Sequence, residues 1–225
     1  MATPSHNPVD RRPIAARAWP LSAKAAHALV RLGLSPNQIS ILGMLCGIAA
    51  GAALALTQQS IHPRPLWLAA AALVQLRLLA NMLDGMVAIE SGKTSALGEL
   101  YNDVPDRISD AAALVGLGYA AGGSYELGFT AALLAILTAY IRAVGKAAGA
   151  PSDFRGPMAK QQRMFLVTIT ALYAAAAPAS WSFAWGPRDS WGLPAATLAL
   201  ITLGAAITCL RRLRATANTL REKPA

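Results

Sequence analysis

Acidic and amide side chains gather in two neighbouring stretches of this chain, RLLANMLDGMVAIE and LGELYNDVPDRISD. In the first stretch Asn81 and Asp84 are three residues apart and Arg77 precedes Asn81 by four, so a helix would place all three on one face. In the second stretch Asn102 and Asp106 are four residues apart and form another face. Carboxylate and amide oxygens gathered in this way suit a hard divalent cation such as Mg²⁺ or Mn²⁺, which prefers oxygen ligands and substrate phosphates. The two faces therefore predict a metal site, provided that the two stretches meet.

The same residues also have structural interpretations. Asn81 and Asn102 can hydrogen-bond one helix to another inside a membrane. Gly85, directly after Asp84, and Gly98, four residues before Asn102, can simply allow helices to pack closely. The two carboxylates can form structural ion pairs with nearby arginines, namely Arg77, Arg107 and Arg142. Spacing alone does not choose between these interpretations and a metal site.

A further carboxylate leaves the register of the second face open. Asp103 follows Asn102, but one residue is about 100° round a helix, so Asp103 can join that face only if the helix is distorted. Pro105 can cause such a distortion, because it removes one backbone hydrogen bond and crowds the preceding turn. Alternatively, Asp103, Asp106 and Asp110 form one face by themselves, since they are spaced by three and four residues.

The composition indicates that the solvent of these stretches is a lipid bilayer. Of the 225 residues, 55% are hydrophobic and only 14% are charged, whereas soluble domains carry about 25% charged residues. The net charge of +9 is compatible with nucleic acid, anionic lipid or a phosphorylated substrate, and the hydropathy makes nucleic acid an unexpected partner. The two cysteines, Cys46 and Cys209, lie far apart in apolar runs and are expected to be buried rather than disulfide-bonded.

The apolar segments predict an all-α integral membrane protein with six transmembrane helices. A spanning helix needs roughly 20 mostly apolar residues, and the segments of that kind are 39–57, 66–90, 98–121, 127–148, 157–180 and 193–210. The stretch from Pro13 to Leu34 mixes Ala, Leu and Trp19 with spaced basic residues, which favours an amphipathic helix in the interface over a plain solvated arm. We thus expect an N-terminal arm and interfacial helix (1–34), a six-helix domain (35–212) and a short tail (213–225). The polar, basic N-terminus does not resemble a cleaved secretory signal.

Basic residues alternate between the connections and predict the orientation of the helices. Lys and Arg crowd the N-terminus, the second-to-third and fourth-to-fifth connections and the C-terminus, whereas the opposite loops carry only Arg64 and Arg188. By the positive-inside rule, both termini and the polar site are cytoplasmic, in the cell inner (plasma) membrane. Four tryptophans fall at the predicted outer ends, where an aromatic belt is expected: Trp67, Trp181, Trp185 and Trp191.

The central motif resembles the signature of the CDP-alcohol phosphotransferases, DxxDGxxAR followed after eight residues by GxxxDxxxD. The signature positions fall in order on Asn81, Asp84, Gly85, Ala88 and Ile89, and then on Gly98, Asn102 and Asp106. Five of the eight residues match and every spacing is kept. The segments LSPNQISILG, YIRAVGKAAG and RGPMAKQQR also resemble the family's approach to its first helix and the basic region of its fourth and fifth helices.

The resemblance implies a fold, a reaction and a set of site residues. Family members are similar six-helix membrane proteins with a cytoplasmic-facing site and a short amphipathic N-terminal helix. Their first three signature aspartates are metal ligands and the fourth is the proposed general base. This implies Mg²⁺ or Mn²⁺ at Asp84, Asp106, Asn81 and Asn102, with Asp103 as a further candidate ligand and Asp106 as the base. Residues expected at the substrates are Arg77, Gly85, Ala88, Gly98, Arg142, Lys160 and Arg163.

The implied reaction transfers a phosphoalcohol group, in most members a phosphatidyl group from CDP-diacylglycerol, to an acceptor hydroxyl with release of CMP. The acceptor alcohol is not identified by the sequence, and a homodimer is compatible with it. The basic residues Arg142, Lys160 and Arg163 also have an interpretation as positive-inside anchors or lipid headgroup contacts.

Departures from the signature keep two other functions open. Asn81 and Asn102 each remove one negative charge from the implied metal site, and Ile89 replaces the signature arginine. These changes favour a catalytically silent homologue that binds lipid or nucleotide. A small transporter is the other alternative, because charge inside a membrane also marks ion paths; its charges should spread through the bilayer, whereas these cluster on one side.

Overall fold

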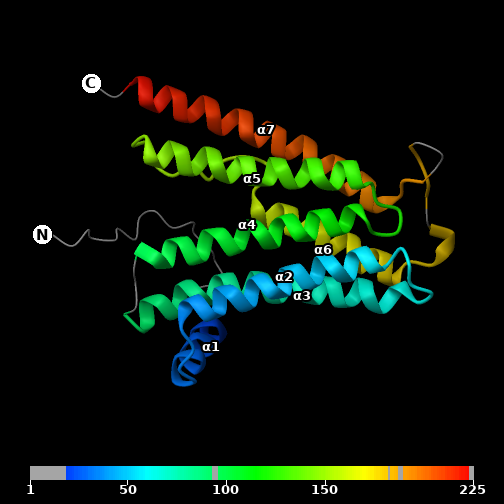
Figure 1. The fold of residues 1–225 in the computed structure, drawn as a ribbon, viewed down its shortest axis with the longest axis horizontal. Coiled ribbons are helices and arrows are strands. Elements are labelled where there is room, and N and C mark those ends of the chain that lie inside the picture. Colours follow the sequence, from blue (N-terminus) through cyan, green and yellow to red (C-terminus); the bar gives the residue numbers. More distant parts are fainter. Residues whose placement is uncertain (1–18, 93–95, 182, 187–189, 223–225) are drawn as a thin grey trace, which may run out of the picture.

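The computed structural model describes residues 19–92, 96–181, 183–186 and 190–222, and this part of the chain is all-α, as predicted. Figure 1 shows the long helices running side by side, with the short α1 beside them. The helices are α1 (Pro20–Arg31), α2 (Pro36–Leu56), α3 (Pro63–Glu90), α4 (Ala96–Gly118), α5 (Tyr125–Ala147), α6 (Lys160–Ala176), the 3-10 turn η3 (Ala179–Trp181) and α7 (Leu193–Arg221). The predicted arm, Lys93 and Arg188 lie outside the described residues.

The six long helices correspond to the six predicted segments, with differences at their ends. α2 begins at Pro36 because Ser35 caps it and Gln38 completes a capping box. α6 is shorter than predicted, with 17 residues, because Pro178 stops the helix. α7 is longer than predicted and reaches Arg221, since its basic end keeps helical geometry after the apolar run is over.

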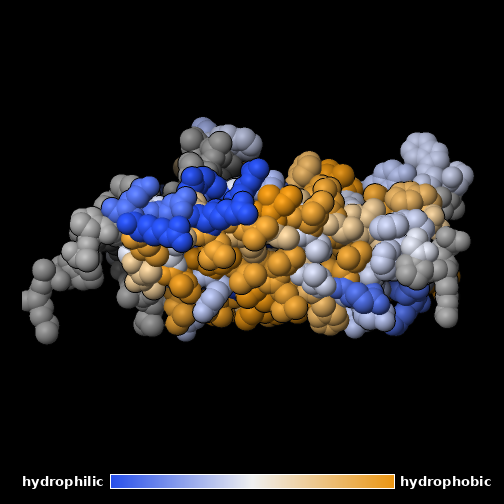
Figure 2. Space-filling view, turned by 90° about the horizontal axis from the view of Figure 1, so that it is seen from above, coloured by the Kyte–Doolittle hydropathy of each residue, from blue (hydrophilic) through white to orange (hydrophobic). Residues whose placement is uncertain are grey.

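Among the described residues, four helices are long and apolar enough to cross a membrane by themselves: α2, α3, α5 and α7. α6 is shorter, with 17 residues, and α4 is charged along its first half. Figure 2 shows the consequence for the surface, a broad apolar band along the middle with hydrophilic residues gathered towards the ends. The described part therefore has the surface of a multi-pass membrane protein.

The connections divide between two ends of the bundle. In Figure 1 the α1–α2, α3–α4 and α5–α6 connections and the end of α7 lie at one end, and the α2–α3 and α4–α5 connections at the other. At that second end, Trp185 and Trp191 pair through an isolated β-bridge and an edge-to-face ring contact. Trp67 is 3% exposed and packs in the hydrophobic core, so it does not contribute to the predicted aromatic belt at the outer ends.

The helix α1 covers the end of α3 that carries the signature motif. Ala26 is buried against Met82, Leu83 and Val87 of α3, in a small cluster of apolar residues. His27 Nδ1 also lies 2.5 Å from Glu90 at the end of α3. The described part of the predicted amphipathic stretch therefore forms a helix over Pro20–Arg31, which packs against the motif-bearing end of α3.

Glycines let α2 pack closely against α3 and α4 at once. A Cβ atom added to Gly43 would lie 2.9 Å from Ala80 of α3, and one added to Gly47 would lie 2.3 Å from the Ser109 Cβ of α4. By contrast, α3 and α4 meet mainly through long polar side chains. α2 therefore packs along both α3 and α4, whose polar faces meet beside it.

We expect Gly51→Ala to lower the unfolding temperature of the purified protein. The new Cβ would lie 2.3 Å from the backbone oxygen of Ala112, and a backbone atom cannot move aside without shifting α4. Overpacking of this kind costs about 1–3 kcal/mol. The matched control is Ala52→Val at the exposed neighbouring position, which should leave the temperature unchanged; equal unfolding temperatures for both variants would contradict the close α2–α4 contact.

Candidate active site

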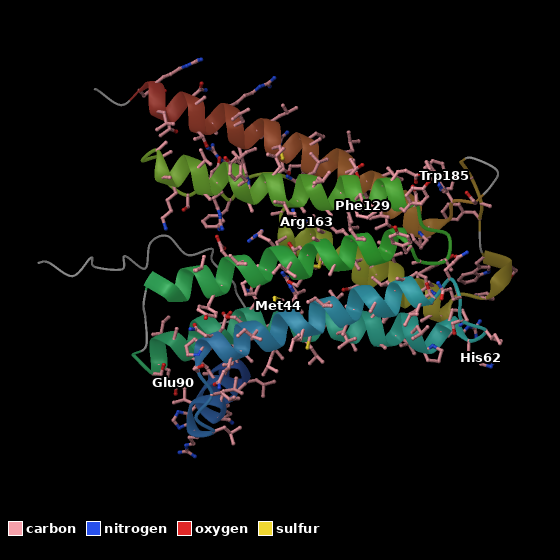
Figure 3. The ribbon with its side chains drawn as sticks, in the orientation of Figure 1. Met44, His62, Glu90, Phe129, Arg163 and Trp185 are labelled. Atoms are coloured by element: carbon pink, nitrogen blue, oxygen red, sulfur yellow. The ribbon has the colours of Figure 1, made fainter. Side chains whose placement is uncertain are left out.

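The two polar stretches meet at a small recess between α2, α3 and α4. Asn81 Nδ2 donates hydrogen bonds to Asn102 Oδ1 at 2.8 Å and to Asp106 Oδ2 at 3.2 Å. Asp84 lines the same recess. The other lining residues come from these three helices and are Ser40, Gly43, Met44, Arg77 and Pro105. Figure 3 labels Met44 between the Glu90 end of the bundle and the end with His62 and Trp185.

Lys160, the first residue of α6, reaches the same oxygens. Its Nζ donates to Asn81 Oδ1 at 2.5 Å and also to Asp106 Oδ2. The Lys160 side chain is 16% exposed, and the free volume left in the recess is about 10 Å³, roughly that of one water molecule. An ammonium group therefore lies between two of the side chains that were predicted to bind a metal.

Asp84 is held by a serine that the sequence analysis did not single out. Ser40 Oγ of α2 donates a hydrogen bond to Asp84 Oδ2 at 2.6 Å, and both residues are buried. Ser40 also lies 3.2 Å from the Pro36 carbonyl oxygen one turn earlier. A serine within an apolar helix commonly bonds its own backbone in this way, so the sequence carried no signal for the contact with Asp84.

Behind the recess, α3, α4 and α6 are joined by buried ion pairs. Asp110 lies between two arginines, with Arg77 Nη2 2.6 Å from its Oδ1 and Arg163 Nη2 3.1 Å from its Oδ2. All three side chains are at most 2% exposed. Figure 3 shows Arg163 within the bundle, between the two ends. Such burial inside a membrane protein requires pairing, because isolated charges are costly there.

Arg77 connects this cluster to the recess. Its Nη2 donates to Asp106 Oδ1 and to the Asp106 backbone oxygen, both at 3.1 Å, and its Nε donates to Ser109 Oγ at 2.9 Å. The remaining Nη1 is buried and has no hydrogen-bond partner among the described residues. Arg77 therefore fixes one oxygen of Asp106, and its Nη1 group is left without a partner among the described residues.

Asp103 lies outside the recess. It accepts two hydrogen bonds from Arg142 Nη2 of α5, at 2.9 and 3.0 Å, and its side chain is 42% exposed. The Arg142 guanidinium also lies 5.4 Å from the centre of the Phe154 ring. Asp103, Asp106 and Asp110 thus have three different sets of partners, although they share one side of α4.

The remaining predicted substrate residues lie near the recess without lining it. Gly85 and Ala88 follow Asp84 on α3, and Gly98 is in the first turn of α4. All three are partly exposed.

The chemistry of the donor set fits one divalent ion, bound weakly. The recess offers two carboxylates, Asp84 and Asp106, and two amide oxygens, from Asn81 and Asn102. Within the described ranges, no group of three His, Cys, Asp or Glu side chains is placed to hold a metal. Oxygen donors of this kind match Mg²⁺ or Mn²⁺, but the low charge count predicts lower affinity than four carboxylates would give.

Comparisons with known proteins agree with the motif. The family model described as CDP-alcohol phosphatidyltransferase matches residues 33–218. A phosphatidylinositol phosphate synthase of Mycobacterium marinum is 31% identical over 195 residues, which are 84% of this chain and 76% of that protein. Another, from Streptomyces avermitilis, is 26% identical over 155 residues, 66% of this chain and 61% of that protein.

Solved structures of the same kind share the fold. The crystal structure of Mycobacterium tuberculosis phosphatidylinositol phosphate synthase with CDP-DAG bound is 25% identical to this chain and has a TM-score of 0.71. The comparison covers 91% of this chain and 98% of that one. A second crystal structure of that enzyme, with the same identity and TM-score, contains manganese and citrate.

Proposed function

Because this chain belongs to the CDP-alcohol phosphatidyltransferase family, we propose that the recess at Asp84 and Asp106 is where it carries out the family's reaction. The protein is an enzyme of phospholipid synthesis that moves a phosphoalcohol group from a CDP-linked donor to an acceptor hydroxyl and releases CMP. One observation supports this placement above others: the two carboxylates kept at signature positions line one recess with both asparagines.

Asp106 is the proposed general base. Arg77 holds its Oδ1, so Oδ2 faces Asn81, Lys160 and the recess. Asp106 Oδ2 takes the proton of the acceptor hydroxyl, whose oxygen then bonds to the phosphorus nearest the alcohol. The bond between that phosphorus and the CMP oxygen breaks, and CMP leaves with its negative charge.

Asp84, Asp106 and the oxygens of Asn81 and Asn102 are the groups that would hold Mg²⁺ or Mn²⁺. When a divalent ion is bound there, its charge stabilises the negative charge on the leaving CMP. Arg77 Nη1, which has no hydrogen-bond partner among the described residues, is the proposed contact for the donor pyrophosphate.

For the substrates, we propose CDP-diacylglycerol as donor and a phosphorylated polyol such as inositol phosphate as acceptor. The proposal follows the names of the relatives and the CDP-DAG in the M. tuberculosis structure. Arg142, partly exposed beside Phe154, is the candidate contact for the acceptor phosphate. Arg163 and Asp110 are buried together, which favours a supporting role for Arg163 over the predicted direct substrate contact.

In the membrane, we propose six spans. The charged α4 and the short α6 cross inside the bundle, where the longer helices cover them. The arm and interfacial helix (1–34), the helical domain (35–212) and the tail (213–225) would then have the recess and both termini on the cytoplasmic side of the inner membrane.

The function is tested with the purified protein in lipid nanodiscs. CDP-diacylglycerol, Mg²⁺ or Mn²⁺ and one acceptor at a time are supplied, and CMP release and lipid mass are measured. We expect release to require metal and one acceptor class, with inositol phosphate ahead of glycerol phosphate, inositol and serine. Binding of CDP-diacylglycerol without CMP release for any acceptor would instead identify a silent homologue.

The orientation can be tested by cysteine labelling. With Cys46 and Cys209 replaced by serine, Ser91→Cys and Ser190→Cys should react with a membrane-impermeant thiol reagent from opposite sides. The expected result follows from the alternation of basic connections. Labelling of both positions from the same side would contradict the six-span arrangement.

A further inference from the structure

The ammonium group of Lys160 lies where the signature motif is expected to bind a metal cation, and its contacts indicate a role for this residue. On the premise of the proposed function, we infer that Lys160 is a built-in cation of the site. Its ammonium group stands between Asn81 and Asp106 and supplies the positive charge that a divalent ion supplies in the pattern with four aspartates. The divalent requirement of this enzyme is thereby reduced to an ion held on the Asp84 side.

The position of Lys160 is fixed by the segment before it. Met158 N–H donates to Thr208 Oγ1 of α7 at 3.1 Å, and the Met158 carbonyl accepts a hydrogen bond from Arg163 at 2.9 Å. Met158 also packs against Gly204 of α7. The backbone of Met158, two residues before Lys160, is therefore held through both its N–H and its carbonyl group, which fixes the start of α6 next to the recess.

Helix stability does not explain a lysine at this position. Lys160 is the first residue of α6, where the helix dipole is positive and a cation is unfavourable. The first turn of α6 also has no acidic residue to offset it. The partners of Nζ are instead Asn81 of α3 and Asp106 of α4, on two other helices.

The charges in closest contact at the site balance when Lys160 is included. The buried carboxylates are Asp84, Asp106 and Asp110, and the cationic side chains within hydrogen-bond distance of Asp106 and Asp110 are the buried Arg77 and Arg163 and the 16% exposed Lys160. Arg107 lies further away, 3.9 Å from Asp106 Oδ2. The three closest cations therefore offset the three carboxylates without an external ion. Aspartates at positions 81 and 102 would add two negative charges, which is the charge that one divalent ion neutralises.

This balance gives the two asparagines a role beyond weak ligands. An asparagine at position 81 accepts a hydrogen bond from the ammonium group without adding charge, and it donates to Asn102 and Asp106 at the same time. Lys160 and the Asn81/Asn102 pair therefore form one arrangement, and a change in either should alter metal binding.

The test measures Mn²⁺ binding, by electron paramagnetic resonance and calorimetry, to the full chain in nanodiscs. Lys160→Met should bind Mn²⁺ on the order of tenfold more tightly, because the ammonium group that competes with the metal ion for Asp106 is removed. The same variant should lose most CMP release. Lys160→Arg keeps the charge and should bind Mn²⁺ like the wild type. Lys24→Met, an exposed lysine of α1, is the matched control and should change neither property.

Two results would overturn the inference. One is unchanged Mn²⁺ affinity in Lys160→Met together with a raised KM, which would make Lys160 a substrate contact only. The double variant Asn81→Asp/Asn102→Asp is expected to bind Mn²⁺ more tightly and to gain metal-dependent thermal stability. An unchanged Mn²⁺ affinity in this variant is the second result that would overturn the inference. This double variant also carries the test if Lys160→Met does not fold. Failure of the proposed function is distinct, because the wild type would then release no CMP while the Mn²⁺ affinities still differed as expected.

Discussion

Asp106→Asn is expected to abolish CMP release, with a loss of about 10²–10⁴-fold in kcat, the range for a general base. The asparagine keeps the shape of the side chain and can still face Arg77, but it cannot accept the acceptor's proton. It also removes the carboxylate that contacts both Lys160 and Asn81. The measurement is CMP release from the variant in nanodiscs at saturating CDP-diacylglycerol, with thermal unfolding recorded beside it.

Two other carboxylates serve as comparisons. Asp153→Asn, in the α5–α6 connection where Asp153 pairs with Arg155, should retain wild-type turnover. Asp103→Asn should have a smaller effect than Asp106→Asn, since Asp103 faces Arg142 and not the recess. If Asp103→Asn is inactive and Asp106→Asn is active, Asp106 is not the general base, and the result points towards Asp103 and Asp110.

The sequence predicted the fold at the level of helices because membrane constraints are local. The apolar length of a segment and the spacing of its basic residues can be read from that segment alone, and these features predicted the six long helices and the amphipathic α1. The ends of α6 and α7 differ because other effects act there. Pro178 stops α6, and Met158 is held in a non-helical segment by Thr208 of α7.

The candidate site was predictable where residues share a helix face. The helical periodicity of α3 and α4 was enough to predict the four residues that meet there, which are Asn81, Asp84, Asn102 and Asp106. The partners from elsewhere in the chain were not predictable in the same way. Ser40 on α2 approaches Asp84 only because Gly43 and Gly47 let α2 pack along both α3 and α4, which is a property of tertiary packing.

Charge within the apolar segments was the one sequence signal that also indicated contacts between different helices. Arg77 and Arg163 were predicted at the substrates, but both contact Asp110 inside the bundle. A charge buried in a membrane protein needs a partner, so a count of the arginines and aspartates within the apolar segments would have suggested such pairing. It would not have indicated which carboxylate pairs with which arginine.

The largest loss of stability is expected from Asp110→Asn. The substitution leaves Arg77 and Arg163 facing an uncharged side chain, and breaking a buried ion pair by removing one partner costs about 3–5 kcal/mol. Arg77 retains Asp106 as a second carboxylate partner, whereas the described ion pairs of Arg163 are with Asp110 alone. We therefore expect a large drop in the unfolding temperature and a smaller yield of folded protein from membranes.

A double substitution distinguishes the loss of stability caused by an unpaired charge from the loss caused by a changed side-chain shape. Asp110→Asn/Arg163→Gln removes one charge of each sign, so it should recover part of the stability lost in Asp110→Asn, and the two substitutions should be clearly non-additive. Both variants keep Asp106, Arg77 and the recess, so CMP release per folded molecule should fall much less than in Asp106→Asn. An unchanged unfolding temperature in Asp110→Asn would contradict the buried pairing, and additive effects of the two substitutions would show that Arg163 and Asp110 are not energetically coupled.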